Sequence, residues 1–472
     1  MKIWEIKRKL EKTAINLCPD WISILSIISL LYLVYLSPAH QTVLGENLNQ
    51  TMPHTLKLNV TRPLLVDDNL KVELVARDLD FPTSITFVGK DDILLLEKNT
   101  GNVYRIIHGN VTGPLIHIDV SFKDERGLLG VAVSKKENKN STDDISVFLY
   151  YTQCTKIKGQ AKSDRYCGNY IYKYELDSKS NKLINPSLLL NISALPGPSH
   201  NGGVLQMDKE KNLYVTIGDI QPTKYNQTGS FDTTAQNLLN GSFPDGRAGI
   251  LRLTQDGKPI GNGILGDKYP LNLYYAYGIK NSFGMDFDPL TGNLWDTENG
   301  PQFGDEINLV KPGFNSGWEK VQGIWKLNST RHKNGIFSES DKNVKLVNFD
   351  GKGKYSRPEF VWDNTVAPTA LVFLASDKLG QEYRNDIFVG SVKEGTIYHF
   401  DLNKDRKSLS LEGDLADLKV DKKDNASKLI FGKNFGIITD LKVGPDGYLY
   451  VVSGLRGTDE GAVYRIVPKS LK

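Results

Sequence analysis

Apolar and polar side chains alternate in short stretches along most of this chain, and the stretches come in repeated groups. Six groups begin with PTSITFVG at Pro82, GLLGVAVS at Gly127, NGGVLQMD at Asn201, NSFGMDFD at Asn281, TALVFLAS at Thr369 and ITDLKVGP at Ile438. Each group holds a strand, usually a turn rich in Asp, Gly, Pro or Lys, a second strand, and in most cases a third. The period of two predicts antiparallel meanders, and their repetition predicts units stacked around an axis.

The predicted fold is therefore all-β, a six-bladed β-propeller of four-stranded antiparallel blades. The uneven spacing of the groups predicts long insertions on one face. The stretch LKVELVARDL, residues 70–79, precedes the first group, and we expect it to complete the last blade and close the ring. A β-sandwich is the alternative, but it does not account for the repeated strand-turn-strand unit.

The first 68 residues do not follow this pattern. Residues 1–20 are basic, and the run WISILSIISLLYLVYL, from Trp21 to Leu36, holds no charge. Such a flank and run predict a cytoplasmic segment 1–20, a single transmembrane anchor at 21–37, a linker 38–68, and a propeller domain 69–470 that is extracellular or periplasmic. A cleaved signal peptide is the alternative, because the run is shorter than the roughly 20 residues of a comfortable span.

Cysteines and sequons agree with an exported domain. Cys154 and Cys167 flank a polar loop between two strand-like stretches, and in an oxidising compartment we expect a disulfide to close this hairpin. Sequons of the form N-x-S/T begin at Asn49, Asn59, Asn110, Asn140, Asn191, Asn226, Asn240, Asn328 and Asn425. Their number predicts a glycoprotein.

Composition narrows the function classes. With 472 residues, 39% apolar and 24% charged side chains, and a formal net charge of +3, the chain has material for a large core and no electrostatic footprint for nucleic acid. The C-x-x-C-H motif of an attached haem is absent.

One of the seven histidines has an unusual setting. His200 lies between the turn GPS and the pair Gly202-Gly203, just before the first strand of its predicted blade, where a propeller presents residues to its central channel. The glycines let the backbone approach a ligand closely. Asp219 ends the next strand, where a carboxylate can orient the imidazole and raise its basicity. A purely structural histidine is the alternative interpretation.

An ordered set of motifs extends this local pattern. DERGLLGVAV begins at Asp124, HNGG at His200 is followed by a strand ending in IGD, KNSFGMDFDPLTGNLWDTENGPQFGDEINLV begins at Lys280, and SGW begins at Ser316. In these motifs the chain resembles the soluble glucose dehydrogenase and aldose sugar dehydrogenase family over residues 70–467. The resemblance implies a six-bladed propeller that uses pyrroloquinoline quinone (PQQ) with calcium.

The resemblance also implies the roles of individual residues. His200 matches the general base that takes the proton from the sugar C1 hydroxyl while hydride passes to the quinone, and Asp219 matches the acid that supports it. The backbone carbonyls of Gly300 and Pro301, in TENGP, match the loop that holds calcium on the cofactor, where calcium acts as a Lewis acid.

Other matches concern the walls of the site. Asn281 keeps the asparagine of an Arg-Asn pair at the cofactor, whereas Lys280 replaces the arginine and so loses its planar fork. The resemblance also implies contacts of Lys393 at the quinone edge and of Glu125, beside Arg126, near the sugar. Trp318 is expected to be a wall of the sugar site or a core residue. Asp305 and Glu306 are expected to form a second calcium site or a solvated turn.

One departure from the family concerns the cofactor carboxylates. Before the last blade's turn the family carries an Arg-x-Arg-Asp pattern, where this chain has Ile437, Ile438, Thr439 and Asp440. Since PQQ is a tricarboxylate, losing two guanidinium groups without compensation predicts weak cofactor binding or a different ligand. Lys433 or Arg456 could compensate from nearby loops.

Three hypotheses follow. The first is a membrane-anchored, quinone-dependent sugar dehydrogenase that passes electrons to an external acceptor. The second is a non-catalytic propeller that binds a glycan or a protein, since a scaffold alone does not imply chemistry. The third is a calcium-dependent lactonase, which needs side-chain carboxylates converging on a metal in the channel.

Overall fold

The computed structural model describes residues 62–136, 145–156, 165–221, 234–237, 244–421, 426–454 and 461–469. The predicted segments 1–20 and 21–37, most of the linker, Arg456 and the sequons at Asn49, Asn59, Asn140, Asn226, Asn240 and Asn425 lie outside these residues. Within them, no helix is both long and apolar enough to cross a membrane. The helical turns described in the folded unit are short 3₁₀ segments at Leu271–Leu273, Gln381–Tyr383, Lys393–Gly395, Gly413–Leu415 and Ala426–Leu429.

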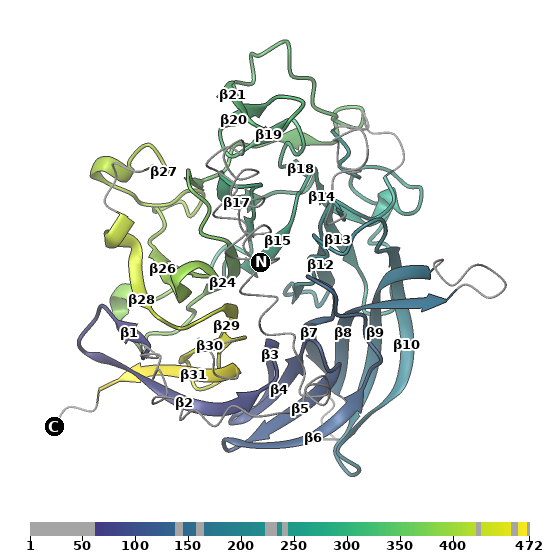
Figure 1. The fold of residues 1–472 in the computed structure, drawn as a ribbon, viewed down its shortest axis with the longest axis vertical. Coiled ribbons are helices and arrows are strands. Elements are labelled where there is room, and N and C mark those ends of the chain that lie inside the picture. Colours follow the sequence, from purple (N-terminus) through teal and green to yellow (C-terminus); the bar gives the residue numbers. More distant parts are fainter. Residues whose placement is uncertain are drawn as a thin grey trace, which may run out of the picture. The chain divides into compact units, whose positions relative to one another are not determined.

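The first half of the described chain forms three successive sheets (Figure 1). The first contains β3 (Pro82–Gly89), β4 (Asp92–Glu97), β5 (Asn102–Ile107) and β6 (Asn110–His117). The second contains β7 (Leu128–Lys135), β8 (Ile145–Lys156), β9 (Arg165–Asp177) and β10 (Lys182–Ser193). The third contains β11 (Leu205–Met207), β12 (Leu213–Ile217), β13 (Gly249–Leu253) and β14 (Tyr274–Tyr277), extended by β18 (Phe314–Asn315) and β22 (Lys354–Tyr355).

The second half continues the same arrangement. The fourth sheet contains β15 (Ser282–Phe287), β16 (Leu294–Glu298), β17 (Asp305–Val310), β23 (Phe360–Trp362) and β27 (Lys419–Val420). The fifth contains β24 (Pro368–Phe373), β25 (Ile387–Ser391), β26 (Ile397–Phe400), β28 (Ile430–Lys433) and β1 (Leu64–Leu65). The sixth contains β29 (Ile438–Val443), β30 (Leu449–Ser453), β31 (Gly461–Pro468) and β2 (Leu70–Leu79), and a small separate sheet joins β19 (Val321–Gln322), β20 (Trp325–Leu327) and β21 (Lys333–Ile336).

Each of the six larger sheets is built on four antiparallel strands, and the added strands β18, β22 and β27 pair in parallel. This confirms the predicted all-β class with four-stranded antiparallel sheets. The first strands of these sheets contact one another in turn, from β3 to β7, β11, β15, β24 and β29, and β29 contacts β3 again. The arrangement of the described strands is therefore propeller-like.

The sheet that closes this cycle combines the two ends of the described chain. β2 pairs antiparallel with β31, with Val72 opposite Ile466. This confirms the expectation that residues 70–79 complete the last sheet. The predicted linker extended too far, because Leu64 and Leu65 already pair with β28. Two apolar residues are too short a pattern to show a strand in the sequence.

Apolar side chains fill the spaces between neighbouring sheets. Because side chains alternate along a strand, each strand turns one face toward the preceding sheet and the other toward the following sheet. A cluster of buried residues therefore forms between each pair of neighbouring sheets. For example, Ile85 of β3 packs with Val452 of β30 and Val463 of β31 in the cluster that joins the sixth sheet to the first. Burial between sheets, rather than within one sheet, therefore holds the strands in place.

The hairpin of β8 and β9 carries the predicted disulfide. Cys154 lies opposite Cys167 in the strand register, and their sulfurs are bonded. The prediction is confirmed.

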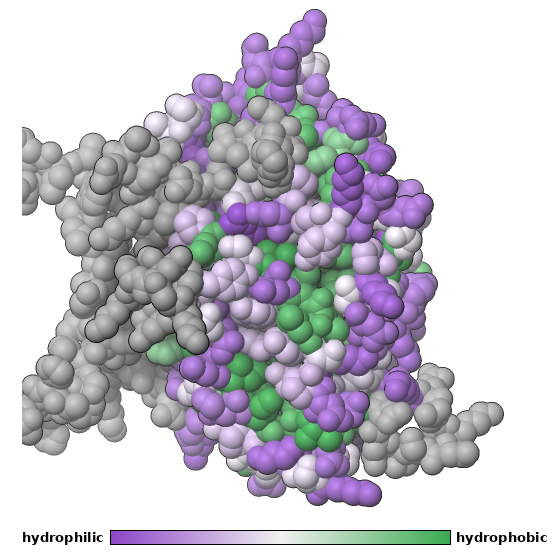
Figure 2. All heavy atoms as spheres, turned by 90° about the vertical axis from the view of Figure 1, so that its right-hand side faces the viewer, coloured by the Kyte–Doolittle hydropathy of each residue, from purple (hydrophilic) through white to green (hydrophobic). Residues whose placement is uncertain are grey.

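On the side of the molecule where β10 lies, Figure 2 shows hydrophobic side chains in separate groups among hydrophilic ones, and β10 itself exposes Ile184 and Leu188. The described sequon residues Asn110, Asn191 and Asn328 are also exposed, so glycosylation stays a prediction that their positions allow.

Candidate active site

A cavity of about 470 Å³ lies where the first strands of the sheets meet. Its lining includes one residue or more from each of these strands: Thr83, Leu129, Leu205, Phe283, Thr369 and Thr439. Pockets of a few hundred Å³ with mostly apolar walls and a few polar groups are typical of small-molecule sites. Several polar groups at this cavity, including Glu125 and Lys280, lie next to His200.

His200 is brought to the cavity by an unusual backbone. Ser199 and Gln221 form an isolated antiparallel bridge, which places His200 beside Asp219. His200 itself has φ +63°, and Gly202 follows with φ +61°. A Cβ added to Gly202 would lie 2.4 Å from the Thr216 carbonyl oxygen, so only glycine fits there. The HNGG sequence thus serves to pack this segment closely against β12.

The histidine and Asp219 form a directed pair. His200 Nδ1 lies 2.5 Å from Asp219 Oδ1, and the Asp219 side chain is fully buried. An ionised carboxylate only accepts, so this contact assigns the proton to Nδ1 and leaves the Nε2 lone pair free to accept. The imidazole is therefore held in the tautomer that a general base requires.

Asp219 is itself held by other donors. Its Oδ2 accepts hydrogen bonds from Trp318 Nε1 at 2.7 Å and from Gln221 Nε2 at 2.5 Å. Burial alone raises the pKa of Asp219, but His200, Lys280 and Trp318 outweigh it and hold the pKa below its ordinary value. The carboxylate is therefore ionised at neutral pH.

Lys280 shares the cavity with the histidine. Its Nζ lies 3.3 Å from His200 Nε2, and its backbone N–H donates to Glu298 Oε1 at 2.8 Å. Burial lowers the pKa of Lys280, although Asp219, Glu125, Asp305 and Glu298 oppose this shift. The Lys280 amine therefore faces the basic nitrogen of His200, and both groups line the cavity.

Glu125 and Asn281 complete this wall. Glu125 Oε2 accepts the His200 backbone N–H at 2.6 Å and Asn281 Nδ2 at 3.0 Å. Asn281 Oδ1 is buried and has no hydrogen-bond partner among the described residues, although the side chain lines the cavity. Glu125 therefore positions two neighbours, and Asn281 keeps one acceptor unused.

The TENGP segment reaches the cavity through Asn299 and Gly300. The Gly300 N–H donates to Asp305 Oδ1 at 2.9 Å, and a Cβ at this position would lie 1.9 Å from the Phe303 carbonyl oxygen. The other carboxylate oxygen of Asp305 accepts the backbone N–H groups of Val366 and Ala367. Asp305 thus ties together two loops beside the cavity.

Comparisons with known proteins identify the family of this chain. A family model described as Glucose / Sorbosone dehydrogenase matches residues 79–465, which is most of the chain. The chain belongs to this family. Aldose sugar dehydrogenase YliI of Escherichia coli is 25% identical over 409 residues, covering 85% of this chain and 94% of that protein. Quinoprotein glucose dehydrogenase B of Acinetobacter calcoaceticus is 23% identical, covering 71% and 78%.

Solved structures show the same fold. The soluble aldose sugar dehydrogenase of Escherichia coli in its apo form has a TM-score of 0.62 at 21% identity, over 85% of this chain and 100% of that chain. The PQQ-bound aldose sugar dehydrogenase of Streptomyces coelicolor has a TM-score of 0.55 at 20% identity, over 84% and 98%.

Three residues that the family resemblance placed at the ligand lie elsewhere. Arg126 is buried and donates through Nη2 to the Ala194 and Gly197 carbonyls, so it fixes the segment before His200. Trp318 is fully buried behind Asp219 and does not line the cavity. Lys393 is exposed and lines a separate cavity of about 210 Å³ with Glu394 and Tyr398. Packing with neighbouring segments decides the direction of each of these side chains.

The two acidic residues of the predicted second calcium site point in different directions. Asp305 and Glu306 are neighbours in β17, so their side chains leave opposite faces of the sheet. Glu306 Oε1 accepts hydrogen bonds from Gln322 Nε2 and the Gly323 N–H. This geometry does not let one cation bind both side chains. Only Glu306 belongs to a larger group of acids.

That group is a buried acidic cluster of Asp296, Glu298 and Glu306. Ser316 Oγ donates to Glu298 Oε2 at 2.6 Å and lies 3.4 Å from Glu306 Oε2. Neither oxygen of Asp296 has a hydrogen bond of ordinary geometry among the described residues, although Asn308 and Ser282 lie near it. Burial raises the pKa of Asp296 to about 7 and that of Glu306 to about 8. Burial, helped by Glu306 and Asp296, raises that of Glu298 well above its ordinary value.

The acidic cluster has the donor chemistry of a hard cation site. Carboxylate and amide oxygens are the ligands that calcium prefers, and Asn308 Oδ1 and Gln322 Oε1 also lack hydrogen bonds within the described residues. Sequence reasoning named only Glu306 here. The repeated strand pattern placed Asp296 and Glu298 in a buried strand, where two acids spaced by two residues were a signal of a shared face.

The cations of the cavity differ from those expected. Ile437 and Thr439 line the wall where the family carries arginines, and the Thr439 hydroxyl donates to the Pro82 carbonyl. Lys433 is exposed on β28 and does not line the cavity.

Lys98 and Lys442 line the cavity instead. Burial lowers the pKa of Lys98 to about 8, opposed by Glu125 and Asp124. Sequence reasoning missed both lysines. Aligning the repeats was the available signal for Lys98, since it follows β4 as Asn299 follows β16.

Proposed function

We propose that this protein is a quinone-dependent sugar dehydrogenase in which His200 is the general base. The observation that carries the proposal is the His200–Asp219 pair, whose Nε2 faces a cavity in a member of the Glucose / Sorbosone dehydrogenase family. The six sheets would be the blades of a closed six-bladed propeller, as their cyclic contacts suggest. The predicted anchor at 21–37 would hold this domain at the outer surface of a membrane.

The described residues fit an anionic, polar cofactor. Three lysines, Lys98, Lys280 and Lys442, line the cavity and can pair with the negative charges of such a cofactor. The named relative with bound PQQ and the quinoprotein relative support PQQ as this cofactor. When bound, it supplies the acceptor for the hydride from the sugar. The Gly300 and Pro301 carbonyls are the groups that we expect to hold its calcium.

The chain's own residues then move the proton. His200 Nε2 accepts the proton of the sugar hydroxyl, and the Asp219 carboxylate stabilises the imidazolium that forms. Because Trp318 and Gln221 fix the other oxygen of Asp219, the imidazole keeps its orientation throughout. Lys280, 3.3 Å from Nε2, must give way or donate to the substrate oxygen when the sugar binds. We also propose that the acidic cluster around Glu306 holds a second calcium.

The test is reconstitution of the purified full-length protein with PQQ and calcium. Reduction of an artificial electron acceptor is measured with a panel of aldoses. We expect turnover in the wild type, and a loss of roughly 10²–10⁴-fold in His200→Ala. His117→Ala is the control, because His117 is exposed and hydrogen-bonds Asn102 outside the cavity. Binding of PQQ or a glycan with no turnover would instead support the non-catalytic alternative, which the replacement of the arginines favours.

A further inference from the structure

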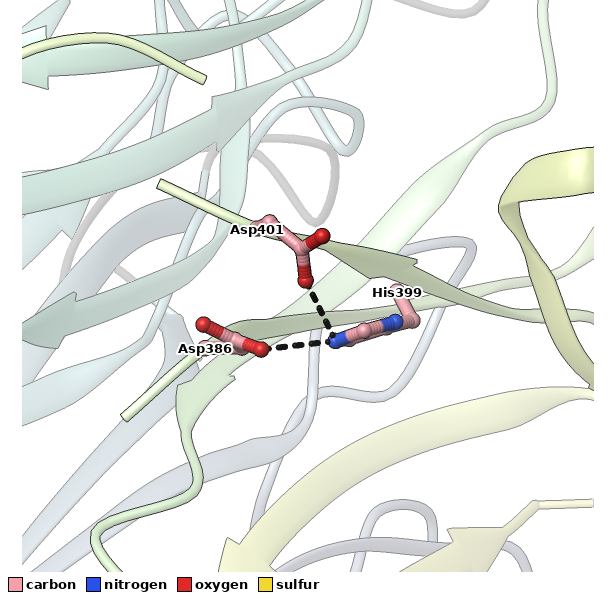
Figure 3. Close-up of side chains that lie close together, drawn as sticks. All are labelled: Asp386, His399 and Asp401. Carbon is pink, nitrogen blue, oxygen red and sulfur yellow. Dashed lines mark hydrogen bonds and ion pairs between the residues drawn. The ribbon is translucent and has the colours of Figure 1, made fainter. Parts of the chain in front are cut away.

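A second histidine of this chain, His399, lies among carboxylates and does not line the cavity. His399 lies in β26 and Asp401 follows two residues later, so both side chains leave the same face of the sheet. Asp386 precedes β25, whose Phe388 pairs with His399. The sheet register therefore brings the three side chains together (Figure 3).

The donor atoms of these residues converge. His399 Nε2 lies 3.0 Å from Asp386 Oδ2 and 3.4 Å from Asp401 Oδ1. One ligand atom from each residue lies within 4.8 Å of the other two. Figure 3 shows both carboxylates turned toward the same ring nitrogen. A single ion of about 2 Å bond length can reach three atoms at such separations.

The imidazole is fixed by its neighbours. The Phe388 ring lies 4.9 Å from that of His399, and the Tyr383 ring lies 5.2 Å from it in an edge-on contact. Tyr383 is tied in turn by its hydroxyl to Asp67 Oδ2 at 3.0 Å. A histidine whose ring cannot turn away loses little freedom on binding a metal.

The site is open on one side. The side chains of Asp386 and His399 are 13% and 21% exposed, whereas that of Asp401 is 60% exposed. Solvent can therefore reach the position between the three donors and complete a coordination shell. One neutral imidazole and two carboxylates, with room for water, form a ligand set that suits zinc and similar first-row ions better than calcium, which prefers oxygen alone.

We propose that Asp386, His399 and Asp401 form a binding site for a divalent transition-metal ion of the zinc type, separate from the sugar site. The ion would join the start of β25 to the end of β26. It would replace the hydrogen bonds that His399 Nε2 makes in its absence with metal bonds to the same three side chains.

The experiment is a zinc titration of the chelator-treated full-length protein by calorimetry, with calcium in excess to occupy oxygen-only sites. We expect one zinc ion per chain at this site, and an affinity lower by roughly ten- to hundredfold in His399→Gln and in Asp401→Asn. Cobalt offers a second readout, because its visible absorption reports the number and geometry of its ligands. Asp401→Asn changes an exposed side chain, and thermal unfolding without metal shows whether either variant is folded.

Two controls separate this site from other histidines. His108→Gln changes an exposed histidine whose Nδ1 lies 4.0 Å from a single Asp91 oxygen, and we expect it to bind zinc like the wild type. His200→Ala removes the cavity histidine, and we expect it to keep the site as well. The proposal is overturned if the wild type binds no zinc, if His399→Gln and Asp401→Asn leave the affinity unchanged, or if His200→Ala removes the binding.

Discussion

Two regions of this protein hold equally buried carboxylates, but one favours the ionised form and the other the protonated form. Asp219 and the acidic cluster of Asp296, Glu298 and Glu306 are all at most 1% exposed. Yet the pKa of Asp219 is lowered, whereas those of Asp296 and Glu306 are raised to about 7 and 8. Burial is common to both, so it cannot be the cause of the difference.

The neighbours of each group explain the contrast. Asp219 faces the potential cation His200, the buried Lys280 and the Trp318 N–H, which favour the ionised carboxylate. In the acidic cluster each acid faces other acids, and the oxygens of Asp296 lack hydrogen bonds among the described residues. Lys280 links the regions, because its carbonyl accepts the Asp219 N–H and its own N–H donates to Glu298. The difference indicates that one region is organised for proton transfer, and that the other needs a proton or a cation to be stable.

The largest expected effect comes from neutralising Asp219. We expect Asp219→Asn to lower turnover of the reconstituted enzyme by roughly 10²–10⁴-fold, because an amide no longer selects the Nδ1–H tautomer of His200 or stabilises the imidazolium. Steady-state kinetics with a responsive aldose measures the loss. Asp92→Asn is the matched control, since Asp92 pairs with Arg105 in the first sheet and does not line the cavity. Turnover in Asp219→Asn equal to that of the wild type would remove His200 from the role of base.

The acidic cluster predicts the opposite response to neutralisation. Without calcium at pH 8, we expect Glu306→Gln to raise the free energy of unfolding by about 2–4 kcal/mol, because the substitution removes an acid that folding forces to stay protonated. Denaturant unfolding in a chelator measures this gain. Glu73→Gln, which breaks a partly exposed ion pair with Arg465, is the control and should not stabilise the protein. Adding calcium should stabilise the wild type more than Glu306→Gln, and a wild type that gains nothing from calcium would contradict the second calcium site.

The pH dependence of the free energy of unfolding should have opposite signs for Asp219 and for the acidic cluster. The pKa of Asp219 is lower in the folded state, so its contribution is present above its unfolded pKa of about 3.9 and is lost as the pH falls through the folded value. The pKa of Glu306 is higher in the folded state, so the chelated protein should lose stability as the pH rises from about 4.3 to 8. Unfolding curves of Asp219→Asn and Glu306→Gln, each compared with the wild type from pH 3 to 8, measure the sign of the two contributions. Parallel curves for the two variants would show that the neighbours do not decide the charges.

The sequence predicted the scaffold well because its signals are local. Alternating strands, the repeats, the completing stretch at residues 70–79 and the Cys154–Cys167 hairpin all follow from patterns within one or two elements. The pairing of His200 with Asp219 also followed, since both lie in one repeat and the Ser199–Gln221 bridge joins their segments.

The walls of the site were harder to predict because they depend on packing between repeats. Arg126 carries a charge that suits an anionic ligand, but two carbonyls of another segment take up its guanidinium. Lys393 lies in a motif that the family resemblance placed at the site, whereas its side chain lines a neighbouring cavity. Lys98 and Lys442 come from different sheets, and no pattern within either segment shows that both line one cavity.

The smallest expected effect concerns the charge of the cavity. Lys98 lines the cavity, and the carboxylates of Glu125 and Asp124 favour its charged form. Because burial lowers the pKa of Lys98 to about 8, its ammonium is present at pH 7 and is progressively lost above pH 8. PQQ affinity, measured by fluorescence titration in calcium, should therefore fall about tenfold in Lys98→Gln at pH 7, the size of one charge-assisted hydrogen bond. Lys98→Arg, whose guanidinium stays charged, should hold its affinity between pH 7 and 9 while that of the wild type declines. Lys433→Gln controls for net charge, since Lys433 lies outside the cavity. Equal affinities for the wild type and Lys98→Gln across this range would show that Lys98 does not replace the lost arginines.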